Sequence, residues 1–188
     1  MFRTAFPSEL REDINVVLKI LPNKTFSDIR ITTSGDVITY TLNNNIIEIP
    51  YRMYLVDIAD AEYDKLSHIQ KQILCCIYTR SCNGYIREKY LRKILDMPFE
   101  QWVIPFIVKL CDEYVIEILE IIYSKLKKRN NTDVQRFCLE NKTIINKSYS
   151  RMTSYWNEYY RGQESNFRKY IGRNLFRECL GYDRTFER

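Results

Sequence analysis

The chain has 188 residues, of which 45% are hydrophobic and 28% charged, and its net charge is +5. These are the values of an ordinary globular domain, so they exclude a wholly disordered chain. No apolar run approaches the roughly 18 residues of a membrane-spanning helix, and the first residues lack the basic and then apolar segments of an export signal. We therefore expect a cytoplasmic protein with no membrane partner, and the abundance of Ile, Lys and Asn favours a bacterial source.

Charge is distributed unevenly along the chain. Residues 124–188 carry a net charge of +8, and the residues before them carry a net charge of −3. The two parts would therefore attract different partners, or each other.

The N-terminal part, residues 1–55, opens with a predicted helix over 8–21. Ser8 can cap this helix, and Pro22 stops it. Its apolar side chains fall on one helical face, so the helix is amphipathic. They are Leu10, Ile14, Val17, Leu18 and Leu21.

Three short β-prone runs follow this helix, separated by turn-forming residues. The runs are Ile29–Thr33, Val37–Leu42 and Ile46–Ile49, and the second turn is Asn43-Asn44-Asn45. Alternating apolar residues and Asn-rich turns favour a small three-stranded meander, which needs a helix to pack on.

The remainder of the chain is predicted to be helical, so the fold class is mainly α. Ser67 and Gln70 have the spacing of a capping box, and Gly181 is a good helix stop. The expected helices cover 67–79, 85–95, 98–111, 114–127, 132–140, 148–161 and 165–180. Asp112-Glu113 is a weak break, so the third and fourth of these could also be continuous. We place helix pairs in residues 56–128 and a basic, aromatic helical part in residues 129–188, the whole forming one compact unit.

Residues 72–88 and 101–117 repeat one pattern at an offset of 29 residues. Each copy reads as an apolar helix, a short polar break and a second apolar helix. Gln72, Cys82, Tyr85 and Glu88 align with Gln101, Cys111, Tyr114 and Glu117. A duplicated helix pair that cannot cover its own apolar face is typical of helical arrays, which commonly bind macromolecules.

The segment Asn83-Gly84-Tyr85-Ile86-Arg87-Glu88-Lys89-Tyr90-Leu91 resembles the start of the second helix in HEAT-type repeats. There, a polar turn is followed by an apolar residue, an arginine and alternating small and large apolar positions. Pro105, Leu110, Asp112 and Val115 resemble the proline, leucine, aspartate and valine of the same family. The resemblance covers residues 67–127 and implies a short curved stack of helix pairs used for binding, with no catalytic residues.

The repeat carries specific structural expectations. One buried stripe should contain Ile73, Leu74 and Ile77 in the first copy and Trp102, Val103 and Phe106 in the second. Ile86 and Val115 should be buried where the second helices start. We expect a positive φ at Gly84, because Asn-Gly favours that conformation.

Catalytic chemistry has little support in the residues. His68 is the only histidine and is expected to be exposed at a helix start. The six cysteines form no C-x-x-C pair, so we expect reduced, mostly buried thiols rather than a metal site. The acidic pairs Asp112-Glu113 and Glu117-Glu120 are expected on a solvated face. We expect no enzyme activity, cofactor or metal.

The C-terminal third, where cations and rings alternate, is the candidate binding surface. Its residues are Tyr160, Arg161, Arg168, Lys169, Arg173 and Arg177. At helical spacing, Tyr155 and Tyr159 fall into a stripe that could instead belong to the core, with the arginines on the opposite, solvated face. On one continuous helix, Lys169, Arg173 and Arg177 would form a single ridge for an acidic partner or phosphate. The first hypothesis is a non-catalytic protein-protein interaction module. The alternative is a nucleic-acid-binding protein that pairs cations with phosphates and stacks rings on bases.

Overall fold

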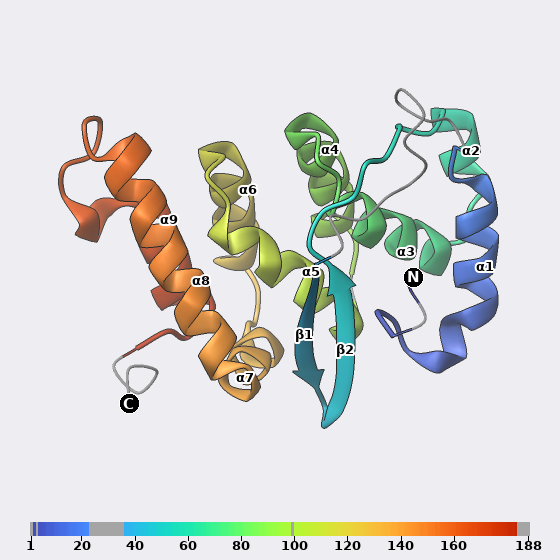
Figure 1. The fold of residues 1–188 in the computed structure, drawn as a ribbon, viewed down its shortest axis with the longest axis horizontal. Helices are drawn as coiled ribbons and strands as arrows, with labels where there is room; N and C mark the ends of the chain where they lie inside the picture. Colours follow the sequence, from blue (N-terminus) through green and yellow to red (C-terminus); the bar gives the residue numbers. More distant parts are fainter. Residues whose placement is uncertain (1, 3, 23–35, 99, 184–188) are drawn as a thin grey trace. The chain divides into compact units, whose positions relative to one another are not determined.

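The computed structural model describes residues 2, 4–22, 36–98 and 100–183, and it is mainly helical (Figure 1). The chain divides into two compact units. The first contains residues Met1–Thr39 and Asn45–Val103, and the second contains Tyr40–Asn44 and Ile104–Arg188. The division at Val103 therefore falls inside the second copy of the sequence repeat. None of the helices in the described ranges has the length and apolarity to cross a membrane.

In the first unit, helix α1 (Arg11–Ile20) follows a 3-10 turn over Ser8–Leu10. Leu10 occupies the N-cap position without a side-chain bond, so the predicted capping by Ser8 is wrong. Val17 is fully buried and α1 packs on α3 (His68–Tyr78), but Leu18, which was expected on the buried face, is 37% exposed.

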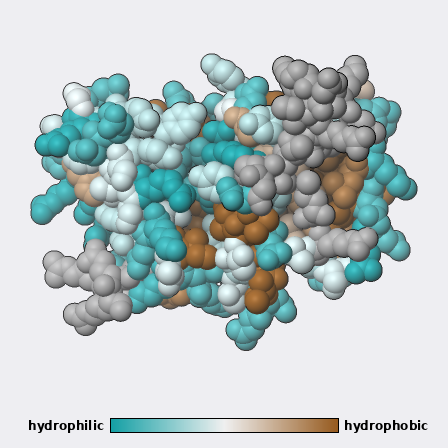
Figure 2. Space-filling view, viewed as in Figure 1, coloured by the Kyte–Doolittle hydropathy of each residue, from teal (hydrophilic) through white to brown (hydrophobic). Residues whose placement is uncertain are grey.

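A β-hairpin is formed by β1 (Val37–Leu42) and β2 (Asn45–Pro50). Asn43 and Asn44 have φ angles of 50° and 65°, which are the left-handed values of a type I′ turn. The second and third predicted strands are therefore confirmed. The first predicted strand, at 29–33, lies outside the described residues. Within the described residues the sheet has two strands, whereas the predicted meander has three. Apolar residues gather over this hairpin in the space-filling view (Figure 2).

Helix α2 (Asp60–Asp64) leads to α3, whose start confirms the predicted capping box. The Ser67 side chain accepts from the Gln70 amide, and the Gln70 side chain accepts from the Ser67 amide. Helix α3 packs on α4 (Gly84–Leu95), where the Tyr78 and Tyr90 rings stack with centroids 4.3 Å apart.

Gly84 begins α4 and does not have a positive φ, so the expected left-handed turn is wrong. Asn83 acts instead as the N-cap, because its side chain accepts from the Tyr85 amide. Ile86 and Val115, both expected to be buried, are only half-buried, since each lies at the open end of its helix.

The second copy of the repeat is less regular than the first. It begins with a 3-10 turn, Gln101–Val103, which leads into helix α5 (Ile104–Val108) and a second 3-10 turn, Lys109–Asp112. The backbone is then extended at Glu113, and α6 (Ile116–Leu126) follows. Residues 98–127 therefore do not form one straight helix. The six residues of the expected stripe are buried: Ile73, Leu74, Ile77, Trp102, Val103 and Phe106.

The second unit continues with α7 (Thr132–Glu140) and α8 (Lys142–Tyr155). The last turn of α8 widens into a π-helical segment, Trp156–Tyr160. The core between these helices and α9 (Ile171–Asn174) is apolar. Its buried side chains include Phe106, Ile118, Ile122, Phe137, Ile145, Met152, Leu175 and Phe176.

The single helix expected over 165–180 is broken. A 3-10 turn covers Phe167–Lys169, Tyr170 is extended with ψ 131°, and α9 runs into a π-helical segment, Leu175–Cys179. The break lets the Tyr170 ring reach the interior, where it is 2% exposed. Gly181 has a φ of 72° and follows the end of this segment, as predicted for a helix stop.

Candidate binding surfaces

The five predicted cations lie on the surface of the second unit. Arg161, Arg168, Lys169 and Arg177 are exposed, and Arg173 is partly exposed. None of them forms an ion pair with a carboxylate of the described residues. We call these five residues the cation set.

The cation set does not form the predicted ridge. Lys169 ends a 3-10 turn, and the extended backbone of Tyr170 separates it from Arg173. Arg177 lies in the π-helical segment, where a wider turn removes the alignment of residues four apart. One guanidinium nitrogen of Arg173 instead lies 3.3 Å from the Arg168 carbonyl oxygen, to which it donates.

The rings that alternate with these cations are used mainly for internal packing. Tyr170 and Phe176 are buried, and the Trp156 and Phe167 rings lie 4.8 Å apart. The Trp156 ring nitrogen donates to the Glu164 carbonyl oxygen over 2.9 Å, and this hydrogen bond links the two ends of segment 156–164. The cation set therefore offers charge for a ligand but few free rings for stacking.

Tyr160, which was grouped with the cations, also contacts residues far away in the sequence. Its hydroxyl donates to the Tyr114 carbonyl oxygen over 2.5 Å. Burial, and then the nearby carboxylates of Glu117 and Glu120, raise the pKa of the Tyr160 phenol. Tyr160 thus lies near acids of α6, while its ring also stacks on that of Tyr170 at 5.8 Å, next to Lys169 in the chain.

Four tyrosines, which we call the tyrosine surface, come together there: Tyr114, Tyr155, Tyr159 and Tyr160. The Tyr114 ring lies 6.0 Å from that of Tyr155 and 6.3 Å from that of Tyr159. Tyr114 is 52% exposed and Tyr159 is 56% exposed. Rings more than half exposed yet in mutual contact form a firm apolar surface with polar hydroxyls at its edge.

A buried ionic cluster lies next to Tyr114 in the sequence. The Lys109 ammonium is 2.5 Å from one carboxylate oxygen of Asp112, and the Arg151 guanidinium contacts the other oxygen. Asp112 and Glu113 are each 2% exposed, so the expectation of a solvated face at this acidic pair is wrong. The reason is that α8 brings Arg151 over Asp112, which tertiary packing alone decides.

Two acids of α6, Glu117 and Glu120, lie close enough to Tyr160 to raise its pKa. Both are exposed, as predicted, and neither forms an ion pair within the described part of the chain. The tyrosine surface is therefore bordered by negative charge.

Sequence reasoning placed Tyr155 and Tyr159 in a helical stripe that could belong to the core, and it aligned Tyr114 with Tyr85 as a repeat position. The four-residue spacing of Tyr155 and Tyr159 did signal a shared face. Periodicity gives no information on what covers such a face.

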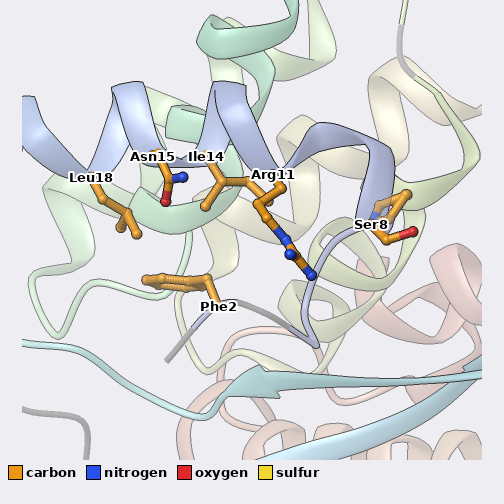
Figure 3. A pocket seen from close by; sticks show the side chains of 7 residues that line it. Phe2, Ser8, Arg11, Ile14, Asn15 and Leu18 are labelled. Carbon is orange, nitrogen blue, oxygen red and sulfur yellow. The ribbon is translucent and has the colours of Figure 1, made fainter.

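A cavity of about 290 Å³ lies in the first unit between α1 and the segment before it (Figure 3). Its lining residues are Phe2, Pro7, Ser8, Arg11, Ile14, Asn15 and Leu18. Four of them belong to α1: Ile14, Asn15 and Leu18 lie three, four and seven positions after Arg11, which places all four on one helical face. Sequence reasoning named only the apolar members of that face.

The histidine and the cysteines are the other side chains that could carry chemistry. His68 is exposed, as expected. Five cysteines are buried and Cys82 is exposed. Burial raises the pKa of the Cys75 thiol to about 12 and that of Cys179 to about 11, so neither is a ready nucleophile at neutral pH. Within the described residues, no three His, Cys, Asp or Glu side chains are placed to hold a metal ion.

Comparison with protein-family models, with curated proteins and with solved structures finds no match to this chain.

Proposed function

We propose that this chain is a non-catalytic protein-binding module that contacts its partner through the tyrosine surface. The observation that carries the proposal is the contact between two rings, Tyr114 and Tyr159, that are each more than half exposed. Tyrosine supplies a large amphipathic contact area with few rotatable bonds, so little side-chain entropy is lost when it is buried by a partner.

The mutual contacts of these rings strengthen this argument. Tyr160 ties the π-helical segment to the Tyr114 carbonyl, and Tyr155 contacts the rings of both Tyr114 and Tyr159. Rings held by neighbours are already ordered before binding, which favours affinity. Aromatic anchors of this kind are enriched among the residues that dominate binding energy.

The charge at the border favours a protein over a nucleic acid at this surface. Glu117 and Glu120 would repel phosphates. They would attract Lys or Arg side chains, which can also lie over the tyrosine faces. We propose that the partner presents basic residues at this surface. We also propose that α3 and α4, in the first unit, form a HEAT-like helix pair whose role is binding and not catalysis.

Photo-cross-linking tests the protein-binding proposal. The photoreactive amino acid p-benzoylphenylalanine replaces Tyr159 in one variant and Tyr85 in a matched control. Tyr85 is 87% exposed and belongs to the other unit. After irradiation in a lysate of the source cells, one defined protein adduct should form from position 159 and not from position 85.

The adduct at position 159 should be lost when Tyr114 is also changed to Ala, and it should weaken in the double variant Glu117→Gln, Glu120→Gln. Equal adducts at positions 159 and 85, or an adduct at 159 that persists without the Tyr114 ring, would contradict the proposal.

Nucleic-acid binding by the cation set is the second candidate. It is favoured by five cations without an ion-paired carboxylate among the described residues. Because phosphate contacts release counterions, binding to a single-stranded oligonucleotide should weaken steeply as salt rises. The variant Lys169→Gln, Arg173→Gln, Arg177→Gln should fold and lose this binding. No shift on a gel at low salt would eliminate this candidate.

A further inference from the structure

The cavity beside α1 combines an apolar wall with polar groups that face the same space (Figure 3). Phe2 and Ile14 are 2% and 7% exposed and form the wall, which Leu18 extends toward solvent. Arg11 and Asn15 lie on adjacent turns of α1 and also line the cavity. Its volume of about 290 Å³ is at the lower limit of small-molecule sites, which begin at roughly 300 Å³.

Arg11 brings a positive charge to this cavity that the described residues do not neutralise. Its guanidinium forms no hydrogen bond or ion pair with any of them, and the Asn15 carboxamide forms none either. Arg11 is also the first residue of α1, where the helix dipole disfavours a cation. The Arg11 amide already donates to the Ser8 carbonyl oxygen, so an anion there would be stabilised by the Arg11 guanidinium.

The acids of this segment limit the charge that a ligand can carry. Glu9, Glu12 and Asp13 lie near the helix start, and none of them lines the cavity. The Asp13 carboxylate accepts from the Gln70 side chain over 2.8 Å. Their negative field opposes a dianion such as phosphate more than a monoanion.

We propose that this cavity binds a small monocarboxylate with a short apolar chain. The carboxylate accepts from the Arg11 guanidinium, whose planar fork matches two carboxylate oxygens, and from the Asn15 amide. The apolar chain lies over the Phe2 ring toward Leu18, where its burial adds hydrophobic stabilisation.

The test uses hexanoate, hexanol and hexylammonium as probes, with binding to the full-length chain followed by NMR chemical shifts. Hexanoate should bind roughly tenfold more tightly than either of the other two, because only hexanoate pairs with Arg11. The largest shifts should come from the amides of Arg11, Asn15 and Leu18. Equal affinity for all three probes, or shifts elsewhere only, would overturn the proposal.

Variants separate the two halves of the site. Arg11→Gln should weaken hexanoate roughly tenfold and leave hexanol unchanged, since only the charge is removed. Lys19→Gln, on the same helix but outside the cavity, should leave both unchanged. If Lys19→Gln weakens hexanoate as much as Arg11→Gln does, the attraction comes from net charge and not from this site. The comparison of the three probes on the unaltered chain decides the matter if Arg11→Gln does not fold.

Discussion

The side chain of Asn141 pairs with the backbone of Thr41 as a neighbouring β-strand would. The Asn141 Oδ1 atom accepts from the Thr41 amide over 2.8 Å, and Nδ2 donates to the Thr41 carbonyl over 2.7 Å. Nδ2 also donates to the Phe137 carbonyl over 2.8 Å. The Asn141 carboxamide, at the end of α7, thus provides hydrogen-bond partners for the Thr41 N–H and carbonyl on β1 and for the Phe137 carbonyl on α7.

Asn141→Ala should lower the free energy of unfolding by about 2–3 kcal/mol. The reason is that three hydrogen bonds at a side chain only 5% exposed are lost, which leaves the Phe137 carbonyl buried and the Thr41 backbone groups partly buried without these partners. Urea unfolding followed by circular dichroism measures the change. Glu140→Ala is the matched control, because the Glu140 carboxylate accepts from the Asn43 amide in an exposed position. If Glu140→Ala lowered the free energy of unfolding as much as Asn141→Ala does, the Asn141 pairing would not be the cause of the loss.

Gly172→Ala should destabilise the chain by about 1–3 kcal/mol through overpacking. A Cβ atom at Gly172 would lie 2.7 Å from the Tyr170 ring and 2.9 Å from Met152 Cγ. Gly162 has open space around it, so Gly162→Ala should leave the melting temperature unchanged or slightly raised. Equal melting temperatures for the two variants would mean that the α8–α9 contact yields easily.

Gly84→Ala should not destabilise the chain, and Gly181→Ala should. Gly84 has ordinary backbone angles, and a Cβ atom there would meet only the Arg87 guanidinium, at 3.7 Å. Gly181 has a φ of 72°, and a Cβ atom would lie 3.1 Å from Gln135 Cγ. An L-residue in that conformation costs about 1–2 kcal/mol. Urea unfolding of both variants checks the contrast, which would disappear if Asn83-Gly84 formed the left-handed turn, because both variants would then be destabilised.

Alkylation should distinguish Cys82 from the other thiols. Iodoacetamide at pH 8 should modify Cys82 in the native chain, because it is the one exposed cysteine. The other five should react only in denaturant, since they are buried and, for Cys75 and Cys179, the pKa is raised. Mass spectrometry counts the adducts. Rapid native labelling of Cys75 would show that α3 opens readily.

The stability should decline as pH rises above about 9. Burial raises the pKa of Cys75 from 9.0 to about 12, so the unfolded chain releases this proton in a range where the folded chain retains it. The unfolding free energy therefore falls between these two pKa values and is unaffected below the lower one. Cys75→Ala should make the slope near pH 10 shallower by about 1.4 kcal/mol per pH unit. An unchanged slope in urea titrations at several pH values would contradict this.

Local features of this fold could be predicted from sequence because their causes lie within a few residues. The capping box of Ser67 and Gln70 needs only its own four-residue segment. The Asn43-Asn44 turn and the stop at Gly181 likewise depend on local backbone preference. The burial of Ile73, Leu74 and Ile77 followed from periodicity in one strongly apolar helix.

The candidate sites could be predicted only in part, for a different reason. Sequence located the cations and the tyrosines of the C-terminal third, but it related Tyr160 only to residues that are near in the chain. The Tyr160 hydroxyl instead contacts Tyr114, which is 46 positions away. The cavity at Arg11 was missed because the position of the Phe2 ring cannot be read from the pattern of α1.

The sequence by itself thus determined where most helices and turns begin and end, and which segments are charged. Only the tertiary structure decided that Asp112 is buried under Arg151, that the last helix breaks at Tyr170, and that Tyr114 and Tyr159 remain exposed. The physical reason is that a helical period assigns a side chain to a face, while burial and charge pairing depend on which distant segment packs against that face.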